Sequence, residues 1–259
     1  MNFIKYVVEK SLAKITLSRP DKFNSFNREM ALELQSTLDD AAAADRHVRA
    51  ILLTAEGKAF CAGQDLPEAL DPNGPGIKKI IDEHYNPIIR RIRNIEIPVL
   101  CAVNGVAAGA GANIALACDV VVASASASFL QAFSKIGLIP DSGGTFFLPR
   151  LVGLQRASSL IMLGDRISAD EALRMGMIYK VFDDQHLMQE ASALASTLAS
   201  LPTKALGLSK RLLNESLANS LEQQLERECR IQVEASATYD YNEGVRAFLE
   251  KRKPQFKGE

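Results

Sequence analysis

The sequence predicts an α/β fold in which apolar strands alternate with helices, followed by a helical C-terminal region. In the first part of the chain, short apolar segments end in Gly-containing turns and are followed by helix-like segments. This alternation is typical of parallel strands joined by crossover helices. From about Gln155 onward the pattern changes to one helix after another. At 259 residues, the chain is long enough to bury a substantial core.

The amino-acid composition limits which kinds of binding partner are expected. The chain is 47% hydrophobic and 24% charged, with a net charge of −1. It lacks the excess of positive charge that nucleic acid or an anionic membrane would select, so neither partner is expected. The cysteines show no CxxC spacing, and no His, Asp or Glu spacing indicates a metal site. The start of the chain resembles a strand and no signal peptide, so a cytoplasmic location is expected.

The individual elements follow from local pattern. Residues 3–8 and 12–17 predict a hairpin, and Asn27 is a candidate cap for a helix that runs to about Ala44. The remaining predicted elements are strands at 49–54, 99–103 and 120–124, a loop at 67–76, and helices at 77–94, 186–200, 203–218, 220–237 and 240–251. Ser168 and Glu171 have the spacing of a capping box. We expect a core of residues 1–200 and a helical oligomerisation region of residues 201–259.

An uncharged stretch between Glu96 and Asp119 organises these elements. It begins as an apolar strand, turns at Asn104-Gly105 and continues through Gly and Ala into an apolar helix. Small residues at such a turn leave backbone N–H groups uncovered, which suits an anion or a developing oxyanion. Pro98 and the Asn residues make the stretch a poor transmembrane helix. Asp119 itself is expected to be structural.

A second turn matches this one. In TAEGKAFCAG (54–63) and AVNGVAAGAG (102–111), Gly57 matches Gly105 and Ala62 matches Ala110. The N–H groups of Ala62 and Ala110 are therefore candidates for an oxyanion hole. An alternative explanation is that adjacent β–α turns use Gly and Ala only because their packing is tight. The spacing alone leaves both explanations open.

Four segments of the chain carry a family resemblance: AFCAGQDL, AVNGVAAGAGANIALACDVVVAS, FSKIGLIPDSGGTFFLPR and EGVRAFLEKRKPQF. Together they resemble the enoyl-CoA hydratase/isomerase (crotonase) superfamily over essentially the whole length. The resemblance implies a spiral of repeated ββα units, a C-terminal α-helical trimerisation region and an acyl-CoA thioester substrate. It also implies a homotrimer or a dimer of trimers, with coenzyme A as part of the substrate and no further cofactor.

The resemblance also assigns residues to the site. The oxyanion hole maps onto Ala62 and Ala110, the pair found from the spacing. The substrate and CoA-binding positions map onto Lys22, Gly63, Gln64, Asp65, Leu66, Gly109, Gly111, Asn113 and Phe133. Asp65 either orders its loop or meets the adenine of CoA. Phe248 and Lys251 resemble the terminal residues that reach the CoA of a neighbouring subunit.

Two departures from the family pattern indicate the reaction. The two glutamates that activate water in the hydratases fall at Asn113 and Phe133, and neither residue is an acid. Hydration by that mechanism is therefore not expected. The acid that remains is Asp141, whose apolar neighbours could desolvate it and raise its pKa, as a proton shuttle requires. Alternatively, Asp141 only caps the helix that follows it.

We therefore expect an acyl-CoA isomerase that acts on an unsaturated or epoxidised acyl-CoA. Asp141 would move the proton while the oxyanion hole holds the thioester oxygen. Two alternatives stay open at this point. One is an enoyl-CoA hydratase of fatty-acid oxidation, and the other is an acyl-CoA-binding protein without catalytic activity.

Overall fold

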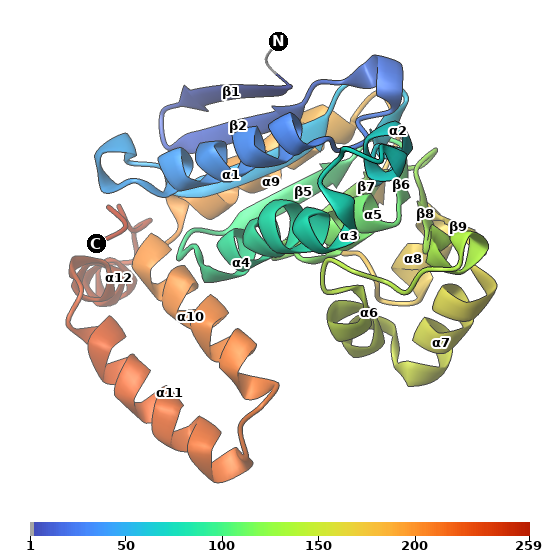
Figure 1. The fold of residues 1–259 in the computed structure, drawn as a ribbon. Helices are drawn as coiled ribbons and strands as arrows, with labels where there is room; N and C mark the ends of the chain where they lie inside the picture. Colours follow the sequence, from blue (N-terminus) through green and yellow to red (C-terminus); the bar gives the residue numbers. More distant parts are fainter. Residues whose placement is uncertain (1–2) are drawn as a thin grey trace.

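The computed structural model describes residues 3–259 and contains two neighbouring β-sheets surrounded by helices (Figure 1). The larger sheet has the strand order β1-β2-β3-β5-β7-β10. Its strands are β1 (Ile4–Glu9), β2 (Leu12–Leu17), β3 (Ala50–Ala55), β5 (Val99–Val103), β7 (Val120–Ser124) and β10 (Lys180–Phe182). The smaller sheet contains β4 (Ala59–Cys61), β6 (Val106–Ala108), β8 (Ser128–Leu130) and β9 (Arg166–Ser168), in that order.

Strand direction follows from the connections. β1 and β2 form the predicted antiparallel hairpin, and β2, β3, β5, β7 and β10 are paired in parallel, as crossover connections require. In the smaller sheet β4, β6 and β8 are parallel, and β9 closes the edge antiparallel to β8. The chain moves repeatedly from the larger sheet to the smaller one. The α/β class and the repeated ββα units expected from the sequence are confirmed.

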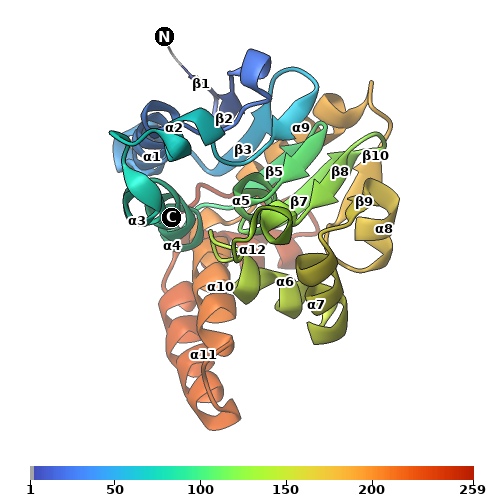
Figure 2. The same cartoon turned by 45° about the vertical axis from the view of Figure 1, so that its right-hand side comes forward.

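Helices cover both faces of the larger sheet (Figures 1 and 2). On one face lie α1 (Arg28–Ala42) and α4 (Asn86–Asn94), and on the other lies α9 (Leu187–Ser200). Alternate residues of β3 point to opposite faces of the sheet. Ile51 and Leu53 pack in the main core, whereas Leu52 packs with the residues of α9. Both faces are therefore apolar, which explains the unbroken apolar runs of these strands.

The remaining helices are mostly short. Two of the predicted N-caps, Asn27 and Ser168, are found at the starts of helices. They are α2 (Leu66–Leu70), α3 (Gly76–Lys79), α5 (Ala110–Leu116), α6 (Gly144–Val152), α7 (Leu154–Leu163), α8 (Ala169–Arg174), and the 3-10 turns η1 (Pro20–Lys22), η2 (Ala44–Arg46) and η4 (Ala132–Ile136). Asn27 caps α1 by accepting from the N–H of Met30 at 3.0 Å. Ser168 and Glu171 form the predicted capping box. α2 lies in the segment that was expected to be a loop.

A π-helical turn interrupts the helix that was predicted over 77–94. This turn, η3 (Ile80–Tyr85), joins α3 directly to α4. Its inward residues are Ile80, His84 and Tyr85, all buried. A π turn inserts an extra residue and so changes the direction in which the following side chains point. The sequence periodicity did not reveal it.

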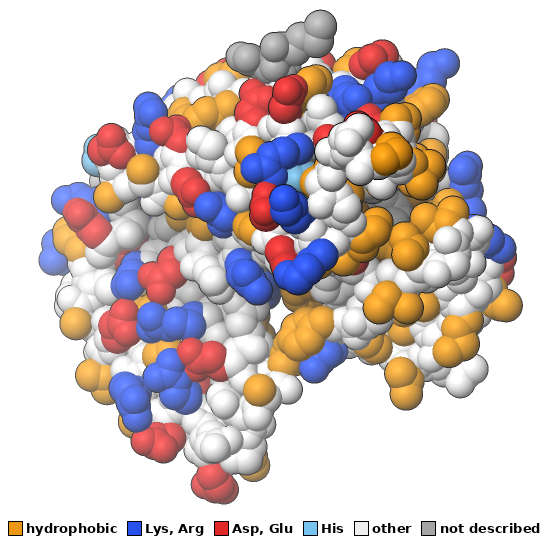
Figure 3. All heavy atoms as spheres, viewed as in Figure 1, with side chains coloured by type: hydrophobic (Ala, Val, Ile, Leu, Met, Phe, Trp, Pro, Cys, Tyr) orange, Lys and Arg blue, Asp and Glu red, His pale blue; other side chains and the backbone are white. Residues whose placement is uncertain are grey.

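The C-terminal helices form an arm that extends from the core (Figure 1). They are α10 (Thr203–Ser216), α11 (Leu221–Ser236) and α12 (Tyr239–Leu249), close to the predicted ranges. Charged side chains cover much of this arm, whereas hydrophobic side chains gather over α6 and α7 on the same side of the molecule (Figure 3). The proposed boundary between residues 200 and 201 stays a prediction.

Asp119 joins the arm to the core, as its structural assignment predicted. One carboxylate oxygen pairs with Arg93 of α4 at 3.1 Å, and the other pairs with Lys210 of α10 at 2.8 Å. The second oxygen also accepts from the N–H of Val99, at the start of β5, at 2.8 Å. The Lys210 side chain is only 7% exposed, so its charge depends on this carboxylate.

Replacing Asp119 should destabilise the fold. Asp119→Ala leaves the buried Lys210 ammonium without its counter-charge, and we expect a loss of about 3 kcal/mol in the free energy of unfolding. Lys210→Met should cost clearly less, because Arg93 and the Val99 N–H still satisfy the carboxylate. Urea unfolding of both variants measures the difference. Wild-type stability in Asp119→Ala would show that this carboxylate does not hold the arm.

Candidate active site

The two matched turns lie side by side because β4 pairs in parallel with β6. The pairing contains a one-residue shift: Ala59 is opposite Val106, but Cys61 is opposite Ala107. Continuing the register beyond Cys61 brings Gln64, and not Ala62, opposite Ala110. The position of Gly63 supports this register, since a Cβ atom built on Gly63 would lie 3.8 Å from the amide nitrogen of Ala110.

The N–H of Ala62 is already used inside the protein. It donates to the carbonyl oxygen of Phe23 at 3.0 Å. The expectation that Ala62 supplies a free N–H is therefore wrong. The two turns have equal spacing in the sequence, which pointed to Ala62. The extra residue in β4 shifts the following residues by one position relative to β6, so this spacing does not hold in the structure.

Gln64 has the geometry that was expected of Ala62. Phe26 donates to the carbonyl of Gly63 at 2.7 Å and accepts from the N–H of Asp65 at 2.8 Å, which forms a parallel bridge around Gln64. In such a bridge the N–H of the middle residue points away from its partner strand. Among residues 3–259, no acceptor is recorded for the N–H of Gln64.

Ala110 supplies the second N–H. It is the first residue of α5, and N–H groups in the first turn of a helix have no acceptor within the helix. Gly109 precedes it with φ +54° and donates its own N–H to the carbonyl of Leu130 at 2.8 Å. Two uncovered N–H groups from neighbouring turns thus lie at the junction of β4 and α5, a typical arrangement for holding a carbonyl oxygen.

Two glycines allow this junction to be so close. Gly63 has φ +97°, and a Cβ there would lie 3.2 Å from the carbonyl oxygen of Ala108. At Gly111 a Cβ would lie only 2.5 Å from the carbonyl oxygen of Cys61. Both predicted site glycines therefore have a backbone role. The contact of α5 with the end of β4 leaves no room for a side chain.

Asp141 lies in the loop between η4 and α6, and its carboxylate accepts from the Ser142 hydroxyl at 2.9 Å. It does not cap α6: that helix begins at Gly144, its N-cap residue is Gly143, and no side chain caps it. The alternative function of Asp141 as a helix cap is therefore not what the structure contains. Burial raises the pKa of Asp141, and the hydrogen bond from Ser142 opposes this shift only in part.

Asn113 fixes the backbone of Asp141. Its Nδ2 donates to the Asp141 carbonyl oxygen at 2.9 Å, and its Oδ1 accepts from Nε2 of Gln131 at 2.8 Å. Since Asn113 is one helical turn beyond Ala110 in α5, this bond ties the Asp141 loop to the helix that carries the Ala110 N–H. Asn113 is 1% exposed and its side-chain amide is engaged within the protein; its expected contact with the substrate stays a prediction.

Phe133 covers the junction from the other side. Its ring lies 3.6 Å from the position of a Cβ built on Gly109. The side chain is 7% exposed and presents only carbon atoms. Neither Phe133 nor Asn113 can therefore transfer a proton here.

The other predicted CoA-binding residues divide into two groups. Lys22 and Leu66 are exposed near the junction and are free to contact a ligand. The carboxylate of Asp65 is occupied: it pairs with Arg19 at 2.6 Å and caps α2 by accepting from the N–H of Glu68. Asp65 thus orders its loop, as one of its two expected functions required, and its contact with CoA stays a prediction.

Phe248 and Lys251 are not near the junction within one chain. Phe248 lies on α12 with 83% of its surface exposed, and Lys251 follows that helix. α12 lies beside the start of α10 and the C-terminus, away from α5 and β6 (Figure 1). Their contact with the CoA of a neighbouring subunit stays a prediction.

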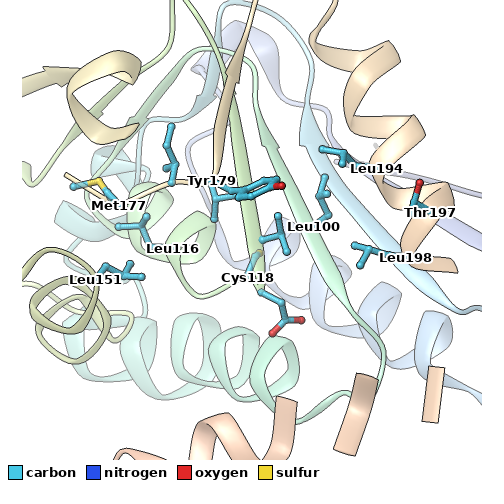
Figure 4. Close-up of a pocket in the computed structure, with 14 residues that line it drawn as sticks. Leu100, Leu116, Cys118, Leu151, Met177, Tyr179, Leu194, Thr197 and Leu198 are labelled. Carbon is cyan, nitrogen blue, oxygen red and sulfur yellow. The ribbon is translucent and has the colours of Figure 1, made fainter. Parts of the chain in front are cut away.

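A large pocket lies away from this junction, near α9 (Figure 4). Its volume is about 510 Å³, and its walls include Leu100, Leu116, Leu194 and Leu198. Its acidic residue is Asp119, which is already paired with Arg93 and Lys210. This pocket is therefore lined mainly by apolar side chains, and its carboxylate is engaged in ion pairs.

Residues 3–259 contain neither a cluster of candidate metal ligands nor a membrane-spanning helix. No group of three or more His, Cys, Asp or Glu side chains in this range could hold a metal ion. No helix in it is long and apolar enough to cross a membrane.

Comparisons with known proteins agree with this fold. Residues 8–259 match the profile of a family described as enoyl-CoA hydratase/isomerase. The 1,2-epoxyphenylacetyl-CoA isomerase of Escherichia coli is 48% identical, over 100% of this chain and 99% of its own. The short-chain-enoyl-CoA hydratase of Clostridium acetobutylicum is 36% identical, over 95% and 94%. The crystal structure of an enoyl-CoA hydratase from Bacillus anthracis superposes with a TM-score of 0.92 at 34% identity, covering 99% of this chain and 100% of that one.

Removing the Asp141 charge should stabilise the fold at neutral pH. Because the pKa of Asp141 is higher in the folded state, stability falls as the pH rises through the unfolded and then the folded pKa. Asp141→Asn should therefore unfold at a higher temperature than the wild type at pH 7, and the difference should shrink toward pH 4. Asp183→Asn, which changes an exposed carboxylate, is the control. A lower unfolding temperature for Asp141→Asn at pH 7 would contradict desolvation of this carboxylate.

Proposed function

This chain belongs to the enoyl-CoA hydratase/isomerase family, and on that basis we propose that it is an acyl-CoA isomerase with Asp141 as its proton shuttle. The observation that carries the proposal is the Asp141 carboxylate. It lies beside α5 with a raised pKa, and its backbone is held by the residue at position 113. Within the junction described above, it is the group suited to moving a proton.

The proposed reaction needs one base and one oxyanion hole. The Asp141 carboxylate removes a proton from the carbon next to the thioester carbonyl of a 3-enoyl-CoA. The electron pair of that C–H bond moves through the conjugated system and leaves a dienolate with its negative charge on the thioester oxygen. The same carboxyl group then returns the proton to the γ-carbon, which gives the 2-enoyl-CoA. Atoms and charge balance without any further cofactor.

The N–H groups of Gln64 and Ala110 are the proposed donors to that oxygen. Donors that already point at the position of the developing charge lower the barrier, because they do not have to reorganise during the reaction. The raised pKa of Asp141 also helps. A carboxylate closer in pKa to neutral pH is a stronger base than an exposed one.

The proposed substrates are an unsaturated acyl-CoA and, following the name of the Escherichia coli relative, 1,2-epoxyphenylacetyl-CoA. In the second case an epoxide on the ring would rearrange to an oxepin of the same formula, which is again an isomerisation. The apolar side chains around Asp141, with Phe147 packed beside Gly143, are compatible with either acyl group.

Binding of the CoA part and assembly complete the proposal. Lys22 and Leu66 would contact CoA within one chain, while Phe248 and Lys251 would reach it from a neighbouring subunit. This arrangement requires a neighbouring subunit, and the proposed assembly is a homotrimer or a dimer of trimers. Exposed apolar side chains on α7 and on the arm support such an assembly: Leu154, Met162, Leu221 and Phe248 are each more than two thirds exposed. The cytoplasm remains the proposed location.

Loss of the Asp141 carboxylate should abolish isomerisation. We expect Asp141→Asn to lower kcat for conversion of 3-hexenoyl-CoA to 2-hexenoyl-CoA by a factor of about 10² to 10⁴, the usual contribution of a general acid or base. KM should change little, since the N–H donors remain. Asp183→Asn should retain full activity. The same pair of variants should be compared with the ring epoxide, and full activity of Asp141→Asn on both substrates would remove Asp141 from the mechanism.

Hydration is the second candidate function, because one relative is named as a hydratase. Asn113 and Phe133 cannot activate water, so water addition to crotonyl-CoA should be far slower than isomerisation of 3-hexenoyl-CoA. The loss of absorbance of the conjugated thioester measures hydration directly. Hydration as fast as isomerisation would contradict the proposal. Binding of acyl-CoA with neither reaction would identify a binding protein.

A further inference from the structure

The side-chain amide of Gln64 is held by hydrogen bonds at both its oxygen and its nitrogen. Its Oε1 accepts from the Tyr85 hydroxyl at 2.9 Å. Its Nε2 donates to Glu68 Oε1 at 3.2 Å. The backbone on both sides of Gln64 is fixed by Phe26, so the residue has little freedom to rotate.

Glu68 is itself fixed by the start of α1. Both of its carboxylate oxygens accept from the N–H of Arg28, at 3.1 and 2.9 Å. The Arg28 side chain pairs in turn with Glu83 of η3. The contacts of Gln64 therefore connect three separate elements: α1, α2 and the π turn.

Tyr85 reaches Gln64 because it is the last residue of the π turn. Its side chain is fully buried, and its ring packs against Phe26 with the centroids 6.0 Å apart. Without the extra residue of the π turn, the helix would present this position about 100° further round its axis. Phe26 thus holds Gln64 through its backbone and Tyr85 through its ring.

The Tyr85 hydroxyl is a constant donor. Burial raises the pKa of Tyr85 well above its ordinary value, and the negative charge of Asp141 adds to this shift. A fully buried hydroxyl requires a partner, and the one it has is the side chain of the residue that carries the proposed oxyanion donor. A Phe would fill the same core volume without this requirement.

We propose that Tyr85 is a positioning residue that holds the N–H of Gln64 in line with the thioester oxygen. This inference rests on the proposed function, since it assigns Tyr85 to the same site. Tyr85 does not touch the substrate, because none of its surface is exposed. It acts through Gln64: a hydrogen bond at the end of the side chain limits rotation of the backbone N–H at its base.

Tyr85→Phe tests the inference, because it removes one oxygen and keeps the ring. We expect kcat for 3-hexenoyl-CoA to fall roughly tenfold, less than for loss of an oxyanion donor itself, while KM changes less than about twofold. Tyr179→Phe, at an exposed tyrosine, is the matched control and should leave both constants unchanged.

A spectroscopic measurement separates positioning from a general structural role. Bound 2,4-hexadienoyl-CoA should absorb at longer wavelength than the free thioester, because the two N–H groups polarise its carbonyl. This red shift should shrink in Tyr85→Phe and persist in Asp141→Asn. Gln64→Met keeps the N–H but removes the acceptor, so it should reproduce the effect of Tyr85→Phe. The double variant should be no worse than either single variant.

The outcomes distinguish this inference from the reaction on which it rests. A full red shift and full kcat in a folded Tyr85→Phe would overturn the inference. Should that variant fold poorly, an unchanged red shift in Gln64→Met would overturn it equally. No red shift in the wild type would disprove the pair of donors, and the inference with it. A red shift in the wild type that shrinks in Tyr85→Phe, without turnover of any acyl-CoA, would support Tyr85 and contradict the isomerase.

Discussion

The candidate site depends on the parallel pairing of β4 with β6 and on the one-residue shift within it. The pairing brings two Gly-containing turns from distant parts of the chain into contact, and the shift sets which N–H faces which. Gly63 and Gly111 permit the contact, because Gly63 has φ +97° and a Cβ at Gly111 would collide with the carbonyl oxygen of Cys61. The other parts of the site are attached to this junction. Asp141 is tied to it through Asn113, and Gln64 is held in it by Phe26 and Tyr85.

Asn113 illustrates how a change of one residue type can change the chemistry of a shared fold. An amide at this position can donate to the Asp141 carbonyl, whereas an ionised carboxylate could only accept. The family resemblance implies an acid here for water activation, and our proposal has in its place a donor that positions a different acid, Asp141. Relatives of this chain include one named as an isomerase and one named as a hydratase. In our proposal, the residues around the junction decide the reaction.

Much of the fold could be predicted from the sequence, because it follows from local patterns. The hairpin, the Asn27 cap, the capping box at Ser168 and the C-terminal helices agree with their predictions within a few residues. The site was predicted less completely. Equal spacing pointed to Ala62, but a bulge in a strand of only three residues has no marker in the sequence and moved the position to Gln64. The π turn that directs Tyr85 toward Gln64 could not be predicted either, because the extra residue in a π turn also has no marker in the sequence.

The central claim is that one carboxyl group, Asp141, takes a proton from one carbon and returns it to another. The most direct measurement follows the label from 3-hexenoyl-CoA that carries deuterium at C2, with NMR of the 2-hexenoyl-CoA product in ordinary water. The account predicts that part of the deuterium appears at C4, because the Asp141 carboxyl is shielded enough to keep some of it between the two steps. Transfer of deuterium to C4 that is retained in Asp141→Asn would contradict the single-carboxyl shuttle.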